Sequence, residues 1–207
     1  MTYFVLSPLA PPHQQFGERV GWEEMVPDME RRAEISVTWM DGRTMLNPFE
    51  MPRELIINGQ ERALPSVFSS KGGITICKQE LKFILEELDP GIHQFIPIKV
   101  AFQSGEVPED SFFILNIHHM LDTIIDEKTR SQKASGTLPD NSKRHFMLYH
   151  LSVRKDGDVT VDKSKLTSVN LWRELAYPGL YMMSDRLQQR LEQEKLAFFE
   201  PHKATEF

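Results

Sequence analysis

The spacing of apolar residues predicts an amphipathic helix within residues 73–91. Leu81, Ile84, Leu85 and Leu88 follow one another at i, i+3, i+4 and i+7, so all four lie on one face of a helix. The Asp-Pro-Gly sequence at 89–91 is typical of a helix end, because proline cannot continue the helical hydrogen-bonding pattern.

A similar pattern near residue 190 predicts a second helix. Ser184 is suited to cap its first turn, and Leu187 and Leu191 lie one turn apart on one face. The helix is expected to end before the Phe-x-Pro sequence at 199–201, and the first helix is also followed by Phe-x-Pro, at 95–97. The two segments are either an internal duplication or two helices that dock alike, and the sequence leaves both open.

Runs of alternating or continuous apolar residues predict strands around these helices. The predicted strands are residues 3–6, 34–39, 95–102 and 111–117, and a hairpin is expected from 145–153 and 159–161. The polar residues 131–142 are expected to form a loop.

The order of these elements predicts an α+β fold. It combines a mixed or antiparallel sheet, two similar short amphipathic helices and a β-rich N-terminal layer. The first seventy residues are rich in proline and glycine, so we expect residues 1–65 to form a β-rich arm packed on a main α+β domain of residues 66–207.

The composition is that of a globular protein, with 40% apolar and 26% charged residues among 207. There is no apolar run long enough to span a membrane, and the first residues lack the features of a secretory signal. The single cysteine, Cys77, excludes an internal disulfide and is expected to be a small buried residue. A cytoplasmic protein that binds neither membrane nor nucleic acid is expected, the latter because the formal charge is −6.

Acidic residues are concentrated in one part of the chain. Residues 100–127 contain six acidic side chains and no lysine or arginine. Such a run forms either a solvated surface or an acidic face that docks on a basic partner. The candidate partner-binding residues are Glu106, Glu109, Asp110, Asp126 and Glu127.

The adjacent His118 and His119, followed by Asp122, invite comparison with a catalytic or metal-binding centre. In condensing acyltransferases the aspartate comes one residue later and a glycine follows it, whereas Thr123 follows here. A zinc hydrolase needs three protein ligands in one cluster. The neighbouring apolar residues recur with helical spacing, which slightly favours a helix or a strand that turns into one. We expect the polar edge of a buried element.

Other catalytic signatures are absent from the sequence. It contains no Gly-x-Ser-x-Gly, no glycine-rich phosphate loop and no His-Glu-x-x-His. We therefore expect no catalytic residue, no metal and no cofactor.

Several segments, taken in order, carry a resemblance to a known family. They are LKFILEELDPG at 81–91, HQFIP at 93–97, FILN at 113–116, LDTIID at 121–126, LWR at 171–173, GLYMMSDRL at 179–187 and FEP at 199–201. In order and rough spacing, residues 66–202 resemble immunity protein family eleven, formerly a domain of unknown function, whose bacterial members are found beside polymorphic toxins.

The resemblance implies a non-enzymatic protein that binds and neutralises a cognate toxin, by occluding the toxin's active site or holding it inactive. Two alternatives remain open at this point. One is a small metal-assisted hydrolase or transferase centred on His118, His119 and Asp122, and the other is a scaffold protein with a peptide partner.

Overall fold

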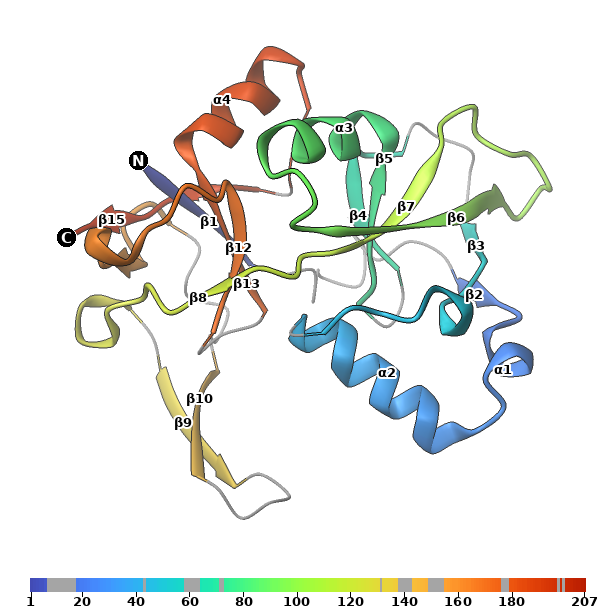
Figure 1. Ribbon diagram of the computed structural model, residues 1–207, viewed down its shortest axis with the longest axis horizontal. Coiled ribbons are helices and arrows are strands. Elements are labelled where there is room, and N and C mark those ends of the chain that lie inside the picture. Colours follow the sequence, from blue (N-terminus) through green and yellow to red (C-terminus); the bar gives the residue numbers. More distant parts are fainter. Residues whose placement is uncertain are drawn as a thin grey trace.

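The structure is a computed structural model that describes residues 1–6, 18–42, 44–57, 64–70, 73–130, 132–137, 143–148, 155–175, 179–196, 198 and 200–207. These residues form an α+β fold with mixed and antiparallel sheets, as the sequence predicts. The described strands include a six-stranded and a five-stranded sheet. The two sheets lie beside each other in Figure 1, with helices α3 (Gln79–Leu88) and α4 (Asp185–Gln193) together along their upper side.

The six-stranded sheet has the order β2 (Glu18–Val20), β3 (Glu54–Ile57), β6 (Gln94–Phe102), β7 (Phe112–Asn116), β5 (Thr75–Lys78) and β4 (Val67–Ser69). Strands β3 and β6 pair in parallel, and the other neighbours pair antiparallel. Strands β6 and β7 confirm the strands predicted at 95–102 and 111–117.

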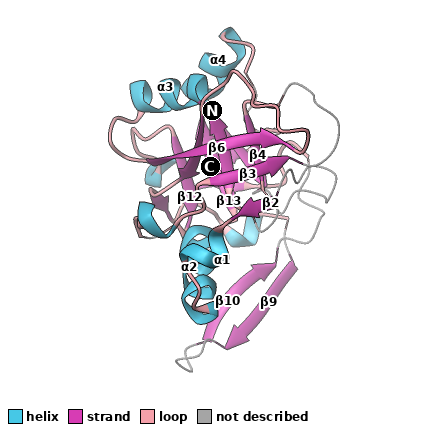
Figure 2. Ribbon diagram, turned by 90° about the vertical axis from the view of Figure 1, so that its right-hand side faces the viewer, coloured by secondary structure: helices cyan, strands magenta, loops and turns pink. Residues whose placement is uncertain are grey.

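Helices cover both faces of this sheet, so successive residues of a strand enter different cores. Ile76 packs with Trp22 and Trp39, which belong to α1 (Trp22–Met25) and α2 (Met29–Asp41). Cys77 points the other way and packs with Leu85 of α3. Figure 2 shows α3 on one side of the sheet and α1 with α2 on the other. Burial on both faces explains why strands such as β7, with the sequence FFILN, consist largely of consecutive apolar residues.

The five-stranded sheet has the order β14 (His202–Lys203), β1 (Thr2–Leu6), β13 (Leu180–Ser184), β12 (Leu171–Glu174) and β8 (Met120–Leu121). Strand β1, predicted at 3–6, pairs antiparallel with β13, in a register that puts Thr2 opposite Ser184. The sheet packs on one side with α3 and α4, and on the other with β11 (Thr160–Val161), which pairs in parallel with β15 (Thr205–Glu206).

The two predicted amphipathic helices are present, and each follows directly on a strand, α3 on β5 and α4 on β13. Leu85 and Leu191 are 0% and 1% exposed in one shared core, so the predicted apolar faces are the buried ones. The Oγ of Ser184 accepts a hydrogen bond from the N–H of Leu187, at 3.1 Å, and caps α4 as expected. Lys78 is the N-cap of α3 and provides no side-chain cap.

The strand predicted at residues 34–39 is wrong, because these residues lie inside α2. Asp28 starts the helix by accepting hydrogen bonds from the N–H groups of Glu30 and Arg31. A helix buries Ile35 and Trp39 one turn apart, as a strand would too. The alternating pattern therefore could not separate the two alternatives.

The first 65 residues contribute to both sheets, through β1, β2 and β3, and also supply α1, α2 and the 3-10 helix η2 (Pro48–Glu50). The division of the chain at residue 65 stays a prediction.

The hairpin predicted from 145–153 and 159–161 is wrong in its pairing. Strand β10 (Lys143–Leu148) pairs with β9 (Gln132–Thr137), so the loop predicted at 131–142 contains a strand. Strands β9 and β10 together project away from the two larger sheets (Figure 1). The Asp-Gly turn does form, since the N–H of Asp158 donates to the carbonyl of Lys155, but it leads into β11. Residues 131, 138–142 and 149–154 lie outside the described residues.

Candidate partner-binding surface

The structure brings three of the five candidate residues together and separates them from the other two. Glu106, Glu109 and Asp110 lie in the connection between β6 and β7, at the right-hand end of Figure 1. Asp126 and Glu127 lie in the 3-10 helix η3 (Asp126–Lys128), which follows β8 at the left-hand end. The five side chains therefore do not form one patch.

The β6–β7 connection has a defined backbone. The N–H of Phe102 donates to the carbonyl of Glu106 at 2.8 Å, and the N–H of Gly105 donates to the carbonyl of Phe102 at 2.9 Å. Gly105 has a φ of 90°, a conformation that glycine adopts without strain. The connection presents exposed side chains, including Val107, which is 53% exposed. It is thus a preformed projection from the sheet.

An ion pair joins this connection to the start of α3. The Nζ of Lys78 lies 2.7 Å from the Oδ2 of Asp110. Next to it, the N–H of Gln79 donates to the carbonyl of Ser111 at 3.0 Å. The connection and the first turn of α3 therefore form one continuous surface.

Three phenylalanine rings surround a lysine on the same side of the molecule. The Nζ of Lys82 lies 5.7 Å from the ring centre of Phe83, 5.6 Å from that of Phe95 and 5.2 Å from that of Phe113. These are cation–π distances. Glu86 accepts a hydrogen bond from the same Nζ at 2.8 Å. Phe83 is 56% exposed, whereas the other two rings are partly buried on the sheet.

Carboxylates flank the exposed ring. Glu80, Phe83 and Glu87 follow one another at i, i+3 and i+7 on the outer face of α3, and Glu87 lies 3.5 Å from Arg190 of α4. We call the whole region the acidic–aromatic surface, made of Lys78, Glu80, Lys82, Phe83, Glu86, Glu87, Phe95, Glu106, Glu109, Asp110 and Phe113.

Sequence reasoning found the acidic part of this surface and missed the aromatic part. The three rings come from α3, β6 and β7, which are separated in the sequence and meet only in the folded sheet. The one signal in the sequence was Phe83, an aromatic residue outside the predicted apolar face of its helix.

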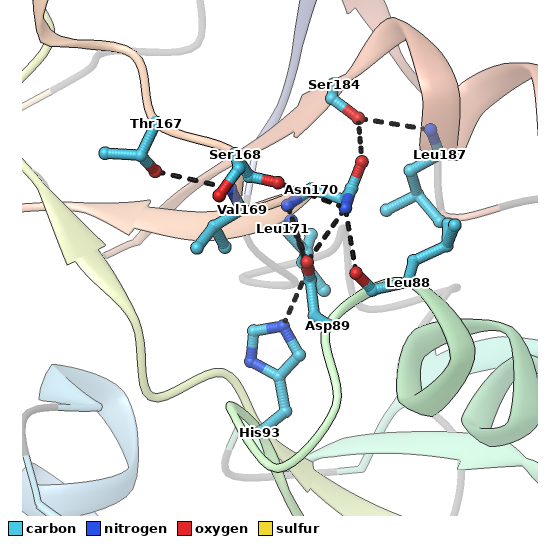
Figure 3. Close-up of polar contacts among 10 residues, drawn as sticks. All are labelled: Leu88, Asp89, His93, Thr167, Ser168, Val169, Asn170, Leu171, Ser184 and Leu187. Carbon is cyan, nitrogen blue, oxygen red and sulfur yellow. Dashed lines mark hydrogen bonds and ion pairs between the residues drawn. The ribbon is translucent and has the colours of Figure 1, made fainter.

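A buried carboxylate at the end of α3 fixes the helix to the second sheet (Figure 3). Asp89 is 3% exposed and accepts hydrogen bonds from the N–H groups of Asn170 and Leu171, all at 2.9 Å. The side-chain amide of Asn170 donates to it at 2.9 Å, and the Nε2 of His93 lies 3.4 Å away. Four donors thus converge on one carboxylate.

Asn170 continues the network toward α4. Its amide also donates to the carbonyl of Leu88 at 3.1 Å, and its Oδ1 accepts from the hydroxyl of Ser184 at 2.7 Å. Ser184 is the residue that caps α4, so the ends of both helices are joined through one asparagine (Figure 3).

The environment of Asp89 favours its charged form. Burial raises the pKa of Asp89, but hydrogen bonds from His93 and Asn170 outweigh that effect and hold the pKa below its ordinary value. The ionised Asp89 carboxylate therefore fixes the position of α3 relative to β12. Because α3 carries Phe83, the network also fixes the acidic–aromatic surface.

Strand β12 sends two ionisable side chains into the interior, on opposite faces. The Nε of Arg173 donates to the carbonyl of Ile117 at 2.8 Å, and its Nη2 donates to the carbonyl of Trp39 at 3.0 Å. Its guanidinium carbon lies 4.8 Å from the ring centre of Tyr181. Arg173 therefore ties α2 to both sheets.

Glu174, the next residue, faces the other core and is fully buried. Its carboxyl accepts hydrogen bonds from the N–H and the hydroxyl of Thr123, and from the indole of Trp172 at 3.1 Å. Burial raises the pKa of Glu174 above its ordinary value, although these donors act in the opposite direction.

The histidine stretch is extended and runs from β7 into β8. The helix, or strand turning into a helix, that its spacing slightly favoured is therefore wrong for these residues. The Nδ1 of His118 lies 3.0 Å from the carbonyl oxygen of Gly42, at the end of α2. The carbonyl of His119 accepts from the N–H of Arg173 at 2.9 Å, and burial lowers the pKa of its ring. Asp122 is exposed and pairs with Lys165 at 3.3 Å. Backbone pairing with β12 explains the extended conformation.

The described residues contain no group of three or more His, Cys, Asp or Glu side chains placed to hold a metal ion. Cys77 is fully buried, as predicted, and burial raises the pKa of its thiol. No helix in the described part of the chain has both the length and the apolar character needed to cross a membrane.

A comparison with known families gives a match over nearly the whole chain. The matching description is Immunity protein family (Imm11), and the match covers residues 12–206. It therefore includes the acidic–aromatic surface, the Asp89 network and most of both sheets. A search among curated proteins gave no match. The chain belongs to the immunity protein family (Imm11).

Proposed function

We propose that this protein protects the cell that makes it by binding a cognate toxin protein, and by occluding the toxin's active site or holding it inactive. The observation that carries the proposal is the family match over residues 12–206. Such protection is stoichiometric and needs a complementary, preformed surface rather than a catalytic centre. We assign the encounter to the cytoplasm, which fits a chain whose one cysteine is a free, buried thiol.

The contact that we propose is the acidic part of the acidic–aromatic surface. A toxin that acts on nucleic acid or a nucleotide needs a basic cleft, and carboxylates can occupy such a cleft as phosphates do. Glu106 and Glu109 are exposed at the β6–β7 connection, whose backbone is held by hydrogen bonds and which projects from the sheet (Figure 1). A standard interface covers about 800 Å² on each partner. We therefore propose that the toxin contacts the β6–β7 connection and does not also reach Asp126 and Glu127 in η3, at the opposite end of the molecule (Figure 1).

Co-expression tests the protection itself. The cognate toxin domain, to be sought in the neighbouring genes, should stop growth when expressed alone, and growth should return when this protein is made in equal or greater amount. Protection that saturates at one immunity protein per toxin supports binding. Protection at a small fraction of that ratio would indicate turnover and contradict the proposal.

Charge reversal tests the contact. Glu106→Lys with Glu109→Lys should slow association with the purified, inactivated toxin domain and reduce the salt dependence of the rate, because peripheral charges act mainly on association. Asp110 is left unchanged, since it is paired with Lys78. The matched control reverses Asp126 and Glu127 at the other end of the molecule. Equal rates for wild type and the first variant would exclude the β6–β7 connection.

A further inference from the structure

The cluster of Phe83, Phe95 and Phe113 on α3 and the sheet is not explained by folding stability alone. A phenylalanine on the outer face of a surface helix gains little from folding, because its ring stays largely in water. Phe83 is 56% exposed, yet two further rings, Phe95 and Phe113, lie around the same lysine. Aromatic side chains are enriched at protein interfaces, where they supply a large contact area at low entropic cost.

We infer that Phe83, backed by Phe95 and Phe113, is the central anchor of the toxin contact and takes a basic side chain of the toxin against its ring face. This inference rests on the proposed function and names the chemistry of the partner at that site. The three rings already accommodate an ammonium group, that of Lys82, at 5.2 to 5.7 Å from their centres. Their orientation toward a cation is therefore built into the free protein.

The charges around the rings identify the occupant. Glu80, Glu86 and Glu87 are exposed on α3 next to Phe83, and the β6–β7 connection, whose Asp110 pairs with Lys78 at the start of α3, carries Glu106 and Glu109 farther out. Glu86 is paired with Lys82 and Glu87 with Arg190, so these two pairs largely cancel and Glu80 supplies the remaining negative charge on this part of α3. A lysine or arginine that reaches the exposed face of Phe83 gains a cation–π contact and nearby carboxylates together.

The same charges argue against a second copy of this chain as the occupant. A two-fold dimer would bring the same patch of both subunits together and set carboxylates against carboxylates. The surface therefore fits a basic protein rather than itself.

The ring is also prepared for binding before the partner arrives. Phe83 stands on a helix whose end is fixed by the Asp89 network, and Phe95 and Phe113 stand on neighbouring strands of a sheet. Rigid elements lose little freedom on association, which is where flexible contacts lose affinity. The carboxylates of the β6–β7 connection then raise the association rate with the toxin, and the cluster of Phe83, Phe95 and Phe113 slows dissociation of the complex.

The two roles separate in a kinetic experiment. The inactivated toxin domain that the growth assay identifies as cognate is immobilised, and its complex with each variant is followed by surface plasmon resonance. Phe83→Ala should raise the dissociation rate on the order of 30-fold, as for an interface hot spot, with little change in association. Phe83→Leu keeps apolar area but lacks the ring face, so its dissociation rate should lie between those of Phe83→Ala and wild type.

An exposed phenylalanine elsewhere provides the matched control. Phe49 in η2 is 78% exposed and lies outside the acidic–aromatic surface, so Phe49→Ala should dissociate within about twofold of wild type. Thermal melts of all variants should coincide with that of wild type, because both rings are exposed.

The outcomes distinguish this inference from the proposed function. Tight binding by wild type with an unchanged rate for Phe83→Ala would overturn the anchor and leave the immunity role intact. Equal rates for Phe83→Leu and wild type would overturn the cation contact. Wild type that neither binds nor protects would overturn the proposed function itself. A dimer of the free protein that Phe83→Ala dissolves would assign the surface to self-association and overturn the inference.

Discussion

Replacing Asp89 with asparagine should destabilise the protein far more than the same change at an exposed aspartate. The asparagine side chain has the same shape, but it offers one acceptor oxygen where the carboxylate offers two. The N–H groups of Asn170 and Leu171 and the amide of Asn170 all point at this group from 2.9 Å. At least one buried donor is then left without a partner, and the remaining bonds lose their charge assistance.

The size of the effect follows from these contacts. An unsatisfied buried donor costs about 1–3 kcal/mol, and a hydrogen bond to a charged group contributes about 1.5–3 kcal/mol. Because the bonds share one carboxylate, they are not additive, and we expect a loss of about 3–5 kcal/mol in the free energy of unfolding. For a chain of this size that corresponds to a fall in melting temperature on the order of 10 °C.

Urea unfolding at pH 7 measures the loss, with Asp122→Asn as the control. Asp122 is exposed and paired with Lys165 at 3.3 Å, so its replacement should cost less than about 1 kcal/mol. A difference of less than about 1 kcal/mol between Asp89→Asn and this control would refute the assignment of Asp89 as a structural support.

The pH dependence provides a second check. The pKa of Asp89 is lowered in the folded protein, so its contribution is complete above the unfolded value of about 3.9 and is lost as the pH falls through and below that value. The stability difference between wild type and Asp89→Asn should therefore stay constant from neutral pH to about 5 and shrink below about 4.

Three further outcomes are expected. Leu85→Ala and Leu191→Ala should each lower the free energy of unfolding by about 2–5 kcal/mol, since both leucines are buried between α3 and α4, and a thermal melt without loss would show that this core is misassigned. For Glu174 the sign of the pH effect is opposite to that for Asp89: its raised pKa gives stability that is present at acid pH and lost as the pH rises above about 4.3. Wild type should thus lose stability relative to Glu174→Gln as the pH rises from about 4.3 through the raised pKa, and urea midpoints that move in parallel would contradict this. Replacing both His118 and His119 with asparagine should leave protection in the growth assay intact as long as the protein folds, whereas loss of protection by a folded variant would restore the histidine pair as a functional site.

The parts of the fold that the sequence predicted are those set by local patterns. Helix α3 carries its apolar residues at helical spacing and ends at Asp-Pro-Gly, and Ser184 has the one side chain needed to cap α4. The strand predicted at 34–39 failed for an equally local reason. Periods of 2 and 3.6 agree on Ile35 and Trp39 and differ at Val37, which is 59% exposed where a strand would have buried it.

The supporting contacts could not be predicted, because their partners are far apart in the sequence. Asp89 was expected to end a helix, and its role depends on Asn170, which no local pattern connects to it. The hairpin of β9 and β10 was missed for a local reason instead, because β9 has the polar sequence QKASGT, which is typical of a loop. In the candidate site, charge showed in the sequence as a run of acidic residues, whereas the rings of Phe83, Phe95 and Phe113 meet only once the sheet has formed.

The position of β1 in the five-stranded sheet has a consequence for the order of folding. Every strand of the six-stranded sheet lies between residues 18 and 116, so that sheet can form while the rest of the chain is still being synthesised. Strand β1 must wait for β13, with which it pairs residue by residue, although it leaves the ribosome first. Closing so long a loop is slow, and we expect β1 to stay unpaired until β13 has been synthesised. A fusion partner that binds residues 2–6 would therefore stop folding at an intermediate. In that intermediate the six-stranded sheet and α3 are formed, whereas α4 lacks the five-stranded sheet on which it packs.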